Sequence, residues 1–192
     1  MSEYIGKVVI NAGHKIGMDP GAVNSELCIN EATIVLKISE LTVDLLNRKY
    51  GVEAYLIQEN ELQDIVNKVN TLDPDAVISE HLNSSDNKTA QGAEIFTTYG
   101  QNNSDILATF VFNEYKKMFP DLYWREDWSD GDADKESGFY ILKGINAPVV
   151  LIEFMFISNN KEGSMISDPI NQMKAAEAVA QGCLKFLKHM NK

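Results

Sequence analysis

The sequence has few cysteines and no long apolar run. Its two cysteines, Cys28 and Cys183, lie far apart in apolar stretches of helical pattern. We therefore expect two buried thiols rather than a disulfide framework, which is usual for a reducing cytoplasm. No segment approaches the roughly 18 apolar residues that a membrane-spanning helix needs, and the N-terminal segment lacks the basic and apolar regions of a signal peptide. The expectation is cytoplasmic synthesis without a signal peptide.

Positive charge is also scarce. The 192 residues include 17 Lys and Arg against 28 Asp and Glu, so the formal net charge is −11. A chain of this charge is repelled by polyanions, which disfavours nucleic acid and anionic membrane surfaces as partners. Apolar residues make up 44% of the sequence, enough to fill the core of one ordinary domain. Because no repeat, linker or low-complexity tract interrupts the chain, we expect a single domain over residues 1–192.

Apolar runs typical of strands alternate with segments of helical spacing. The expected strands cover residues 7–11, 52–58, 77–79, 92–98, 139–142 and 149–153. The expected helices cover residues 30–50, 60–72 and 105–119, and a last helix starts at 168. Asn30 can cap the first helix, and Gly51 can end it. The alternation predicts an α/β fold with a mostly parallel, twisted central sheet and helices on both faces.

Residues 121–138 depart from this alternation. The stretch is polar and acidic and contains both tryptophans, Trp124 and Trp128, so we expect a long surface loop. Its run DWSDGDAD suggests calcium, but the EF-hand register places Lys135 where a glycine is required when Asp130 is the first ligand. We interpret the run as a solvated acidic loop. The aromatic rings could stack on a sugar or a peptide, or they could simply pack within the loop.

Four side chains capable of acid–base or metal chemistry lie where expected strands end or a helix begins. His14, His81 and Glu153 each follow an apolar run, and Glu31 lies in the first turn of the first helix. The carboxyl ends of parallel strands meet at one edge, where open α/β proteins bind ligands, so these residues could share a cleft. Catalytic zinc takes three ligands of these types, and the remaining carboxylate could act as general base and acid.

Each of these residues, taken singly, also has an ordinary structural explanation. His14 or His81 could be a hydrogen-bonded core histidine, and Glu31 could be a carboxylate favoured by the helix dipole. Glu153 is different, because a carboxylate directly after VVLI would be costly if it were buried without a partner, so we expect it to face the cleft. The third histidine, His189, lies in a polar C-terminal tail and is expected to have no special role.

Four blocks of the sequence carry a family resemblance. They are INAGHKIGMDPGAV with His14, NEATIVLKISELTVDLL with Glu31, SEHLNSSDNKTAQGAEIF with His81, and VVLIEFMFISNNKE with Glu153. In order and spacing they resemble the zinc-dependent N-acetylmuramoyl-L-alanine amidases of the amidase-3 type, found in autolysins and phage endolysins. The resemblance implies that His14, Glu31 and His81 bind zinc and that Glu153 is the catalytic acid and base.

Other polar residues in these blocks leave alternatives open. Glu26 is a competing candidate for the carboxylate ligand, although its distance from the apolar run of the first helix favours Glu31. Asn83 and Glu94 belong to the third block and could support the site or bind substrate. An ordinary loop hydrogen bond and a surface charge are equally compatible with these two residues.

The resemblance implies hydrolysis of the amide between N-acetylmuramic acid and L-alanine in peptidoglycan, in cell-wall lysis or remodelling. Since an acidic chain is repelled by polyanionic walls, wall affinity would come from a separate or fused wall-binding domain, or the protein would reach the wall through a phage holin. A peptidase acting within the stem peptide and a catalytically inactive wall-binding module remain alternatives. A non-haem iron enzyme could also use two histidines and one carboxylate.

Overall fold

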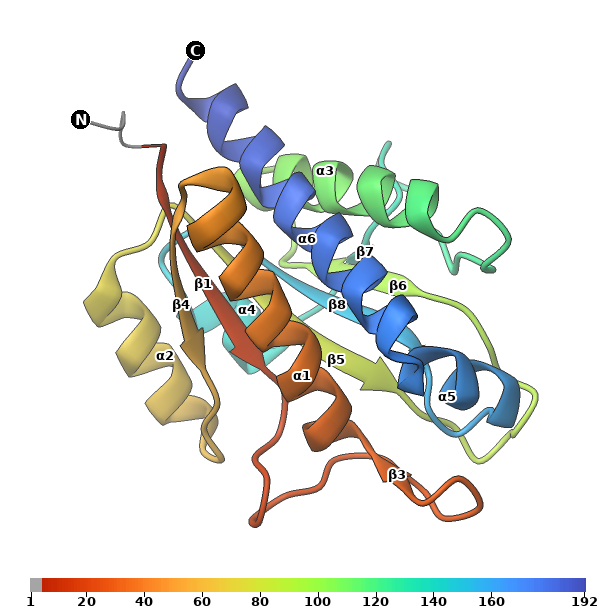
Figure 1. The fold of residues 1–192 in the computed structure, drawn as a ribbon. Coiled ribbons are helices and arrows are strands. Elements are labelled where there is room, and N and C mark those ends of the chain that lie inside the picture. The colour runs from red at the N-terminus through yellow and green to blue at the C-terminus, as the bar shows by residue number, and fades with distance from the viewer. Residues whose placement is uncertain (1–4) are drawn as a thin grey trace.

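A central sheet of six strands organises the molecule, whose computed structural model describes residues 5–192 (Figure 1). Its strands are β4 (Glu53–Ile57), β1 (Lys7–Ala12), β5 (Ala76–Asn83), β8 (Val149–Phe156), β6 (Glu94–Thr97) and β7 (Lys135–Glu136), given in spatial order. A separate hairpin consists of β2 (Val23–Asn24) and β3 (Ile29–Asn30). Residues 1–4, which belong to the expected domain and to the segment searched for a signal peptide, lie outside the described residues.

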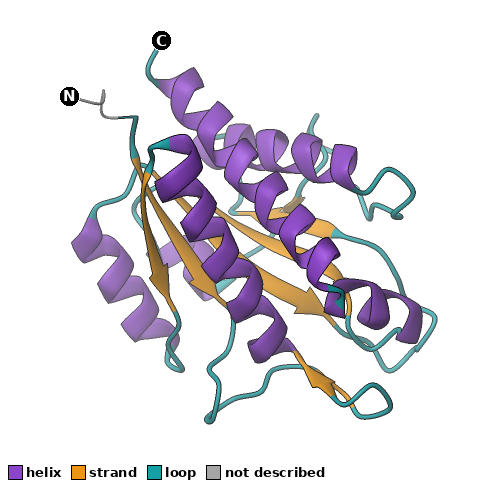
Figure 2. Ribbon diagram, viewed as in Figure 1, coloured by secondary structure: helices purple, strands orange, loops and turns teal. Residues whose placement is uncertain are grey.

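Helices cover both faces of this sheet, as expected from the sequence (Figure 2). One face carries α1 (Glu31–Asp44), α3 (Asn103–Met118) and α6 (Pro169–Met190), and the other carries α2 (Leu62–Leu72) and α4 (Tyr140–Gly144). A π-helical segment, η1 (Leu45–Tyr50), continues α1, and α5 (Asn160–Ser167) precedes α6. Among the described residues, no helix is both long and apolar enough to cross a membrane.

The central strands are buried on both faces because helices pack on each side. Alternate side chains of a strand point to opposite faces, so Ile10 and Ile152 join the cluster under α1, whereas Val9 and Leu151 join the cluster under α2 and α4. Strands covered in this way need apolar residues at every position, which explains their continuous apolar runs. The strands β4, β1, β5 and β8 are parallel, but β6 is antiparallel to β8.

One expected strand is wrong. Residues 139–142 were expected to be extended, but the structure has the short helix α4 at Tyr140–Gly144. A run of a few apolar residues fits a buried strand and one buried turn of helix equally well, and tertiary packing decides between them. Here Ile141 and Leu142 are buried in the cluster beneath α2. The helix α5 was not predicted, since its sequence NKEGSMIS has little apolar periodicity.

The two cysteines differ in their surroundings. Cys183 is fully buried in α6, as expected, and burial raises the pKa of its thiol. Cys28 is exposed between β2 and β3, with a φ of 55°, so the expectation of a second buried thiol in a helix is wrong. Its apolar neighbours belong to a hairpin and to the start of α1, which together mimic a helical pattern in the sequence.

Candidate metal centre

His14 lies in the loop that follows β1. Its φ is 61°, an uncommon value for a residue with a side chain, and the loop is closed by backbone pairing of Lys15 with Asp19. The Asp19 carboxylate lies 2.7 Å from Nδ1 of His14. With Nδ1 engaged, the other ring nitrogen, Nε2, faces the Glu31 carboxylate at 3.2 Å. A carboxylate on the far nitrogen is the usual way in which a protein orients a metal-binding histidine.

Glu31 is the first residue of α1 and is only 3% exposed. The side chain of Asn30 caps the helix by accepting a hydrogen bond from the amide of Thr33, as the sequence predicts. The two carboxylate oxygens of Glu31 accept hydrogen bonds from the amides of Ala22 (2.9 Å) and Leu82 (3.0 Å). The carboxylate is therefore fixed in place, at a helix N-terminus that favours negative charge.

His81 lies within β5 rather than after it. The apolar run ends near Ser79, but the strand continues to Asn83, and Glu80 and His81 still pair with β8. The buried carboxylate of Glu80, directed to the α1 face, accepts hydrogen bonds from Ser39 and Thr42. Residues that alternate along a strand face opposite sides, so His81 lies on the face away from Glu80. Its Nδ1 atom is 3.0 Å from the Glu31 carboxylate.

His14, Glu31 and His81 thus form one cluster, in which one potential ligand atom from each lies within 4.8 Å of the others. Hydrogen bonding to Glu31 raises the pKa of His14 to about 9. Burial acts to raise the pKa of Glu31, but hydrogen bonds with both histidines outweigh burial and hold that pKa well below its usual value. Two imidazole nitrogens and one carboxylate oxygen form a donor set that could hold a metal ion.

Two glycines make room for the cluster, and sequence reasoning missed their role. A Cβ atom on Gly13 would lie 2.3 Å from Cε1 of His81, and one on Gly21 would lie 2.5 Å from Cδ2 of His14. Gly21 also has a φ of 64°, which few residues with side chains adopt. The sequence signal was available, because both glycines lie in the INAGHKIGMDPGAV block, as does Asp19.

Glu153 lies in the middle of β8, beside His81 in the strand register. It lines a cavity of about 400 Å³ together with both histidines of the cluster, so the expectation that it faces the cleft is confirmed. Its Oε2 atom is buried and has no hydrogen-bond partner among residues 5–192. Burial, and then the negative charges of Glu31 and Glu94, raise the pKa of Glu153 well above its ordinary value.

Glu94 pairs with Glu153 across the antiparallel strands β6 and β8. The Glu94 carboxylate accepts hydrogen bonds from Asn83, Arg125 (3.0 Å) and Lys135. The two basic residues come from the acidic stretch 121–138, and sequence reasoning did not connect them with Glu94. Two cations thus neutralise the carboxylate that lies next to Glu153 in the register.

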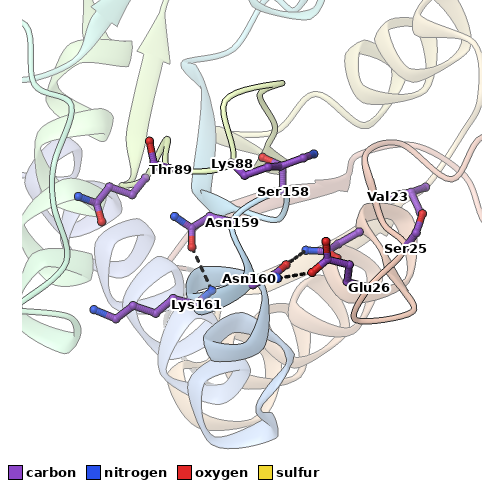
Figure 3. A pocket seen from close by; sticks show the side chains of 11 residues that line it. Val23, Ser25, Glu26, Lys88, Thr89, Ser158, Asn159, Asn160 and Lys161 are labelled. Carbon is purple, nitrogen blue, oxygen red and sulfur yellow. Dashed lines mark hydrogen bonds between the residues drawn. The ribbon is translucent and has the colours of Figure 1, made fainter.

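Glu26 is placed elsewhere by the structure. It is exposed and accepts a hydrogen bond from the side chain of Asn160 at 2.5 Å (Figure 3). Together with Lys88 and Lys161 it lines a separate polar cavity of about 640 Å³. Glu26 therefore does not belong to the cluster of potential ligands, and the preference for Glu31 agrees with the geometry.

The tryptophans do not line the cavity that holds Glu153. Trp124 is 8% exposed and packs against the rings of Phe112 and Tyr115, so it belongs to the core. Trp128 is 60% exposed and borders a different, smaller cavity. The sequence left open whether these rings stack on a ligand or pack within the protein, and Trp124 packs within the protein.

Comparison with known proteins agrees with this geometry. Residues 8–185 match the Amidase_3 family, described as N-acetylmuramoyl-L-alanine amidase. The amidase LytC of Bacillus subtilis is 29% identical over 94% of this chain, and the endolysin of Bacillus phage SPP1 is 28% identical over 94%. The alignments cover 35% and 65% of those two relatives, so the chain spans less than two thirds of each.

Solved structures add a match over the entire fold. The N-acetylmuramoyl-L-alanine amidase from Clostridium difficile 630 superposes with a TM-score of 0.86 at 25% identity, covering 98% of both chains. The amidase AmiC2 of Nostoc punctiforme gives a TM-score of 0.84 at 26% identity, covering 96% of this chain and 98% of that one. With the family match spanning nearly the whole sequence, the chain belongs to the Amidase_3 family of N-acetylmuramoyl-L-alanine amidases.

Proposed function

We propose that residues 1–192 form the catalytic domain of a zinc-dependent N-acetylmuramoyl-L-alanine amidase that acts on the bacterial cell wall. The bond cleaved is the amide between N-acetylmuramic acid and L-alanine in peptidoglycan. One observation carries the proposal: the His14, Glu31 and His81 cluster and the partnerless carboxylate oxygen of Glu153 meet at a single cleft. Family membership and the named activities of the relatives support it.

The donor set fits zinc. Catalytic zinc sites commonly take three ligands from His and Glu and leave one position open. His14, Glu31 and His81 would hold the ion, and Asp19 would fix the ring of His14 through Nδ1. Bound there, zinc would supply Lewis acidity for the scissile carbonyl and for water. A non-haem iron site has similar donors, and metal analysis of the purified protein distinguishes the two ions.

Glu153 is suited to move the proton. Hydrolysis adds the oxygen of water to the carbonyl carbon and breaks the carbon–nitrogen bond, which leaves a carboxylate on the lactyl group and a free amino group on L-alanine. In this proposal Glu153 accepts a proton from the attacking water and passes it to the departing nitrogen. Burial raises the pKa of Glu153, so its carboxylate binds a proton more readily than an exposed glutamate does, which suits a group that takes up a proton and then returns it.

The test is digestion of purified peptidoglycan by the zinc-loaded protein, with the new ends identified by mass spectrometry. The parent protein should release L-alanine amino termini and leave the glycan intact. Glu153→Gln should keep its zinc and lose about 100- to 10,000-fold in turnover, the range that general acid–base catalysis contributes. Glu26→Gln, which alters an exposed carboxylate outside the cluster, is the matched control and should act like the parent.

Other results of this experiment would contradict the proposal in distinct ways. New amino termini inside the stem peptide would identify a peptidase on the same metal site. No cleavage by the fully zinc-loaded parent would favour a wall-binding module without activity. Loss of zinc from Glu153→Gln would make Glu153 a ligand rather than the proton carrier.

A further inference from the structure

Three carboxylates converge at the sheet edge opposite the metal centre. Asp105 lies in the first turn of α3, and Asp132 and Asp134 lie in the loop just before β7. One oxygen from each lies within 4.8 Å of the others. Thr97 ends β6 beside them, and because β6 runs antiparallel to β8, this end lies away from Glu94 and the catalytic cleft.

Two of the three carboxyl groups are buried and that of Asp132 is half-buried, and none is paired with a cationic side chain in the described part of the chain. Asp105 is 5% exposed and Asp134 only 4%. One oxygen of Asp134 accepts a hydrogen bond from the Thr97 hydroxyl at 2.6 Å, but its Oδ1 atom is buried and has no hydrogen-bond partner in the described chain. Asp132 is similar, since its Oδ2 accepts from Gln101 at 3.0 Å whereas its buried Oδ1 has no partner there.

No lysine or arginine within residues 5–192 forms an ion pair with any of the three carboxylates. The nearest basic residue in sequence, Lys135, is committed to Glu94. Burial and the neighbouring carboxylate of Asp132 raise the pKa of Asp134 to about 8. Asp134 therefore keeps its proton at neutral pH in the cation-free protein, and a bound cation would stabilise its ionised form beside the other two carboxylates.

The interpretation of this run as a solvated acidic loop holds for residues 127–131, which are exposed, but not for its last residue. Asp134 is buried, and it faces a carboxylate from a helix that starts about 30 residues earlier in the chain. The EF-hand register, which fails at Lys135, could not have detected this cluster, because that motif draws its ligands from one continuous loop. In this protein the oxygens come from a helix N-terminus and a separate loop, an arrangement that no local motif describes.

We propose that Asp105, Asp132 and Asp134 form a second cation site, distinct from the zinc centre, and that its ion is Ca²⁺. The donors are all oxygen atoms, which suit hard cations and not zinc or copper. Two of them come from an irregular loop, and Ca²⁺ accepts irregular coordination whereas Mg²⁺ requires a near-ideal octahedron. The ion would join the end of β6, the start of α3 and the acidic loop. This site is independent of the proposed amidase activity.

Calcium binding is measured on the zinc-loaded protein, so that the zinc centre is already filled. Isothermal titration should give one Ca²⁺ per chain, with a Kd of about 0.1 to 1 mM, as in extracellular calcium modules. Terbium, a calcium substitute, should give luminescence excited through tryptophan, because Trp128 lines the same small cavity as Asp132 and Asp134. Asp134→Asn should raise the Kd for Ca²⁺ and for terbium by about tenfold or more, which corresponds to a loss of about 1.4 kcal/mol of binding free energy.

The matched control is Asp121→Asn, which removes an exposed carboxylate before the same loop and should bind Ca²⁺ like the parent. Asp134→Asn should fold without Ca²⁺ at least as stably as the parent, because it replaces a buried carboxyl group by a neutral amide of the same shape and keeps an acceptor for Thr97. Added Ca²⁺ should then raise the melting temperature of the parent and the control, but not that of Asp134→Asn.

Three results would overturn the inference. The parent could fail to bind Ca²⁺ at ten times the expected Kd, or Asp134→Asn could bind it as tightly as the parent. Tighter binding of Mg²⁺ than of Ca²⁺ would refute the choice of ion. None of these three results would change the outcome of the peptidoglycan digestion, so the two proposals are tested separately.

Discussion

At the scale of single residues, His14 would couple binding of the proposed zinc ion to pH. Hydrogen bonding to Glu31 raises the pKa of His14 to about 9, so the ring is protonated at neutral pH in the metal-free protein. The imidazolium stabilises the metal-free fold below the unfolded pKa of about 6.5, and this contribution is lost as the pH rises through about 9. A metal ion needs the neutral ring and must displace that proton.

Zinc affinity should therefore rise by about tenfold per pH unit between pH 7 and 8.5, with about one proton released from His14 per ion bound. Competition with a chelator gives the affinities, and titration calorimetry in two buffers of different ionisation enthalpy gives the proton count. His189→Gln changes an exposed histidine in the last turn of α6 and should leave both quantities unchanged. A pH-independent affinity in this range would contradict the role given to His14.

The sequence alone predicted the residues of the cluster better than their supporting contacts. His14, His81 and Glu153 were found because the carboxyl ends of parallel strands share one edge. Their roles stay predictions until they are tested in solution. The contact from Asp19 to His14 and the space left by Gly13 depend on distances between side chains, which spacing along the chain does not give.

At the scale of elements, α3 and α6 approach closely at Gly182. A Cβ atom there would lie 2.7 Å from the backbone Cα of Val111. Gly182→Ala gains about 1 kcal/mol of helix propensity, but overpacking against a backbone costs about 1 to 3 kcal/mol, so we expect a net loss of stability of about 1 kcal/mol. Urea unfolding followed by circular dichroism measures this difference.

Gly138→Ala is the control for this substitution. Its Cβ atom would meet only the Tyr99 ring at 3.5 Å and more distant atoms, which is ordinary contact, so we expect little change. If Gly182→Ala proved more stable than the parent, the helices would have room to separate and the close approach would not constrain them.

The long periodic elements were predictable, whereas short ones and strand direction were not. The spacing of apolar residues gave α1, α3 and α6, since each has several turns with one buried face. The single turn of α4 offers too few residues for a period to be seen. The strand β6 follows the loop after β5 and pairs antiparallel with β8. The direction of a strand cannot be read from its local amino-acid composition.

At the scale of the whole molecule, the candidate metal centre joins three parts of the fold. His14 follows β1, Glu31 begins α1 and His81 lies in β5, so an ion bound there cross-links the sheet to a helix. Zinc at 100 times its Kd should add about 2.7 kcal/mol to the free energy of unfolding, which is about 5 to 10 °C in melting temperature. Differential scanning calorimetry of zinc-loaded and chelator-treated protein measures the shift.

The variant His14→Asn should melt at the same temperature with and without added zinc. The parent would contradict the cross-link if its melting temperature did not change on removal of zinc that metal analysis had shown to be bound. Both measurements are made without calcium, so that the carboxylates of Asp105, Asp132 and Asp134 do not contribute.

The position of β8 in the sheet has a consequence for the order in which the protein is made. The three proposed zinc ligands, His14, Glu31 and His81, lie in the part of the chain that ends with β5, whereas Glu153 is carried by β8, which is inserted between β5 and β6. During synthesis, the ribosome therefore completes the proposed zinc ligands before it adds Glu153, the proposed proton carrier. The proposed activity would therefore have to wait until the last strand enters the middle of the sheet, after every proposed ligand has been made.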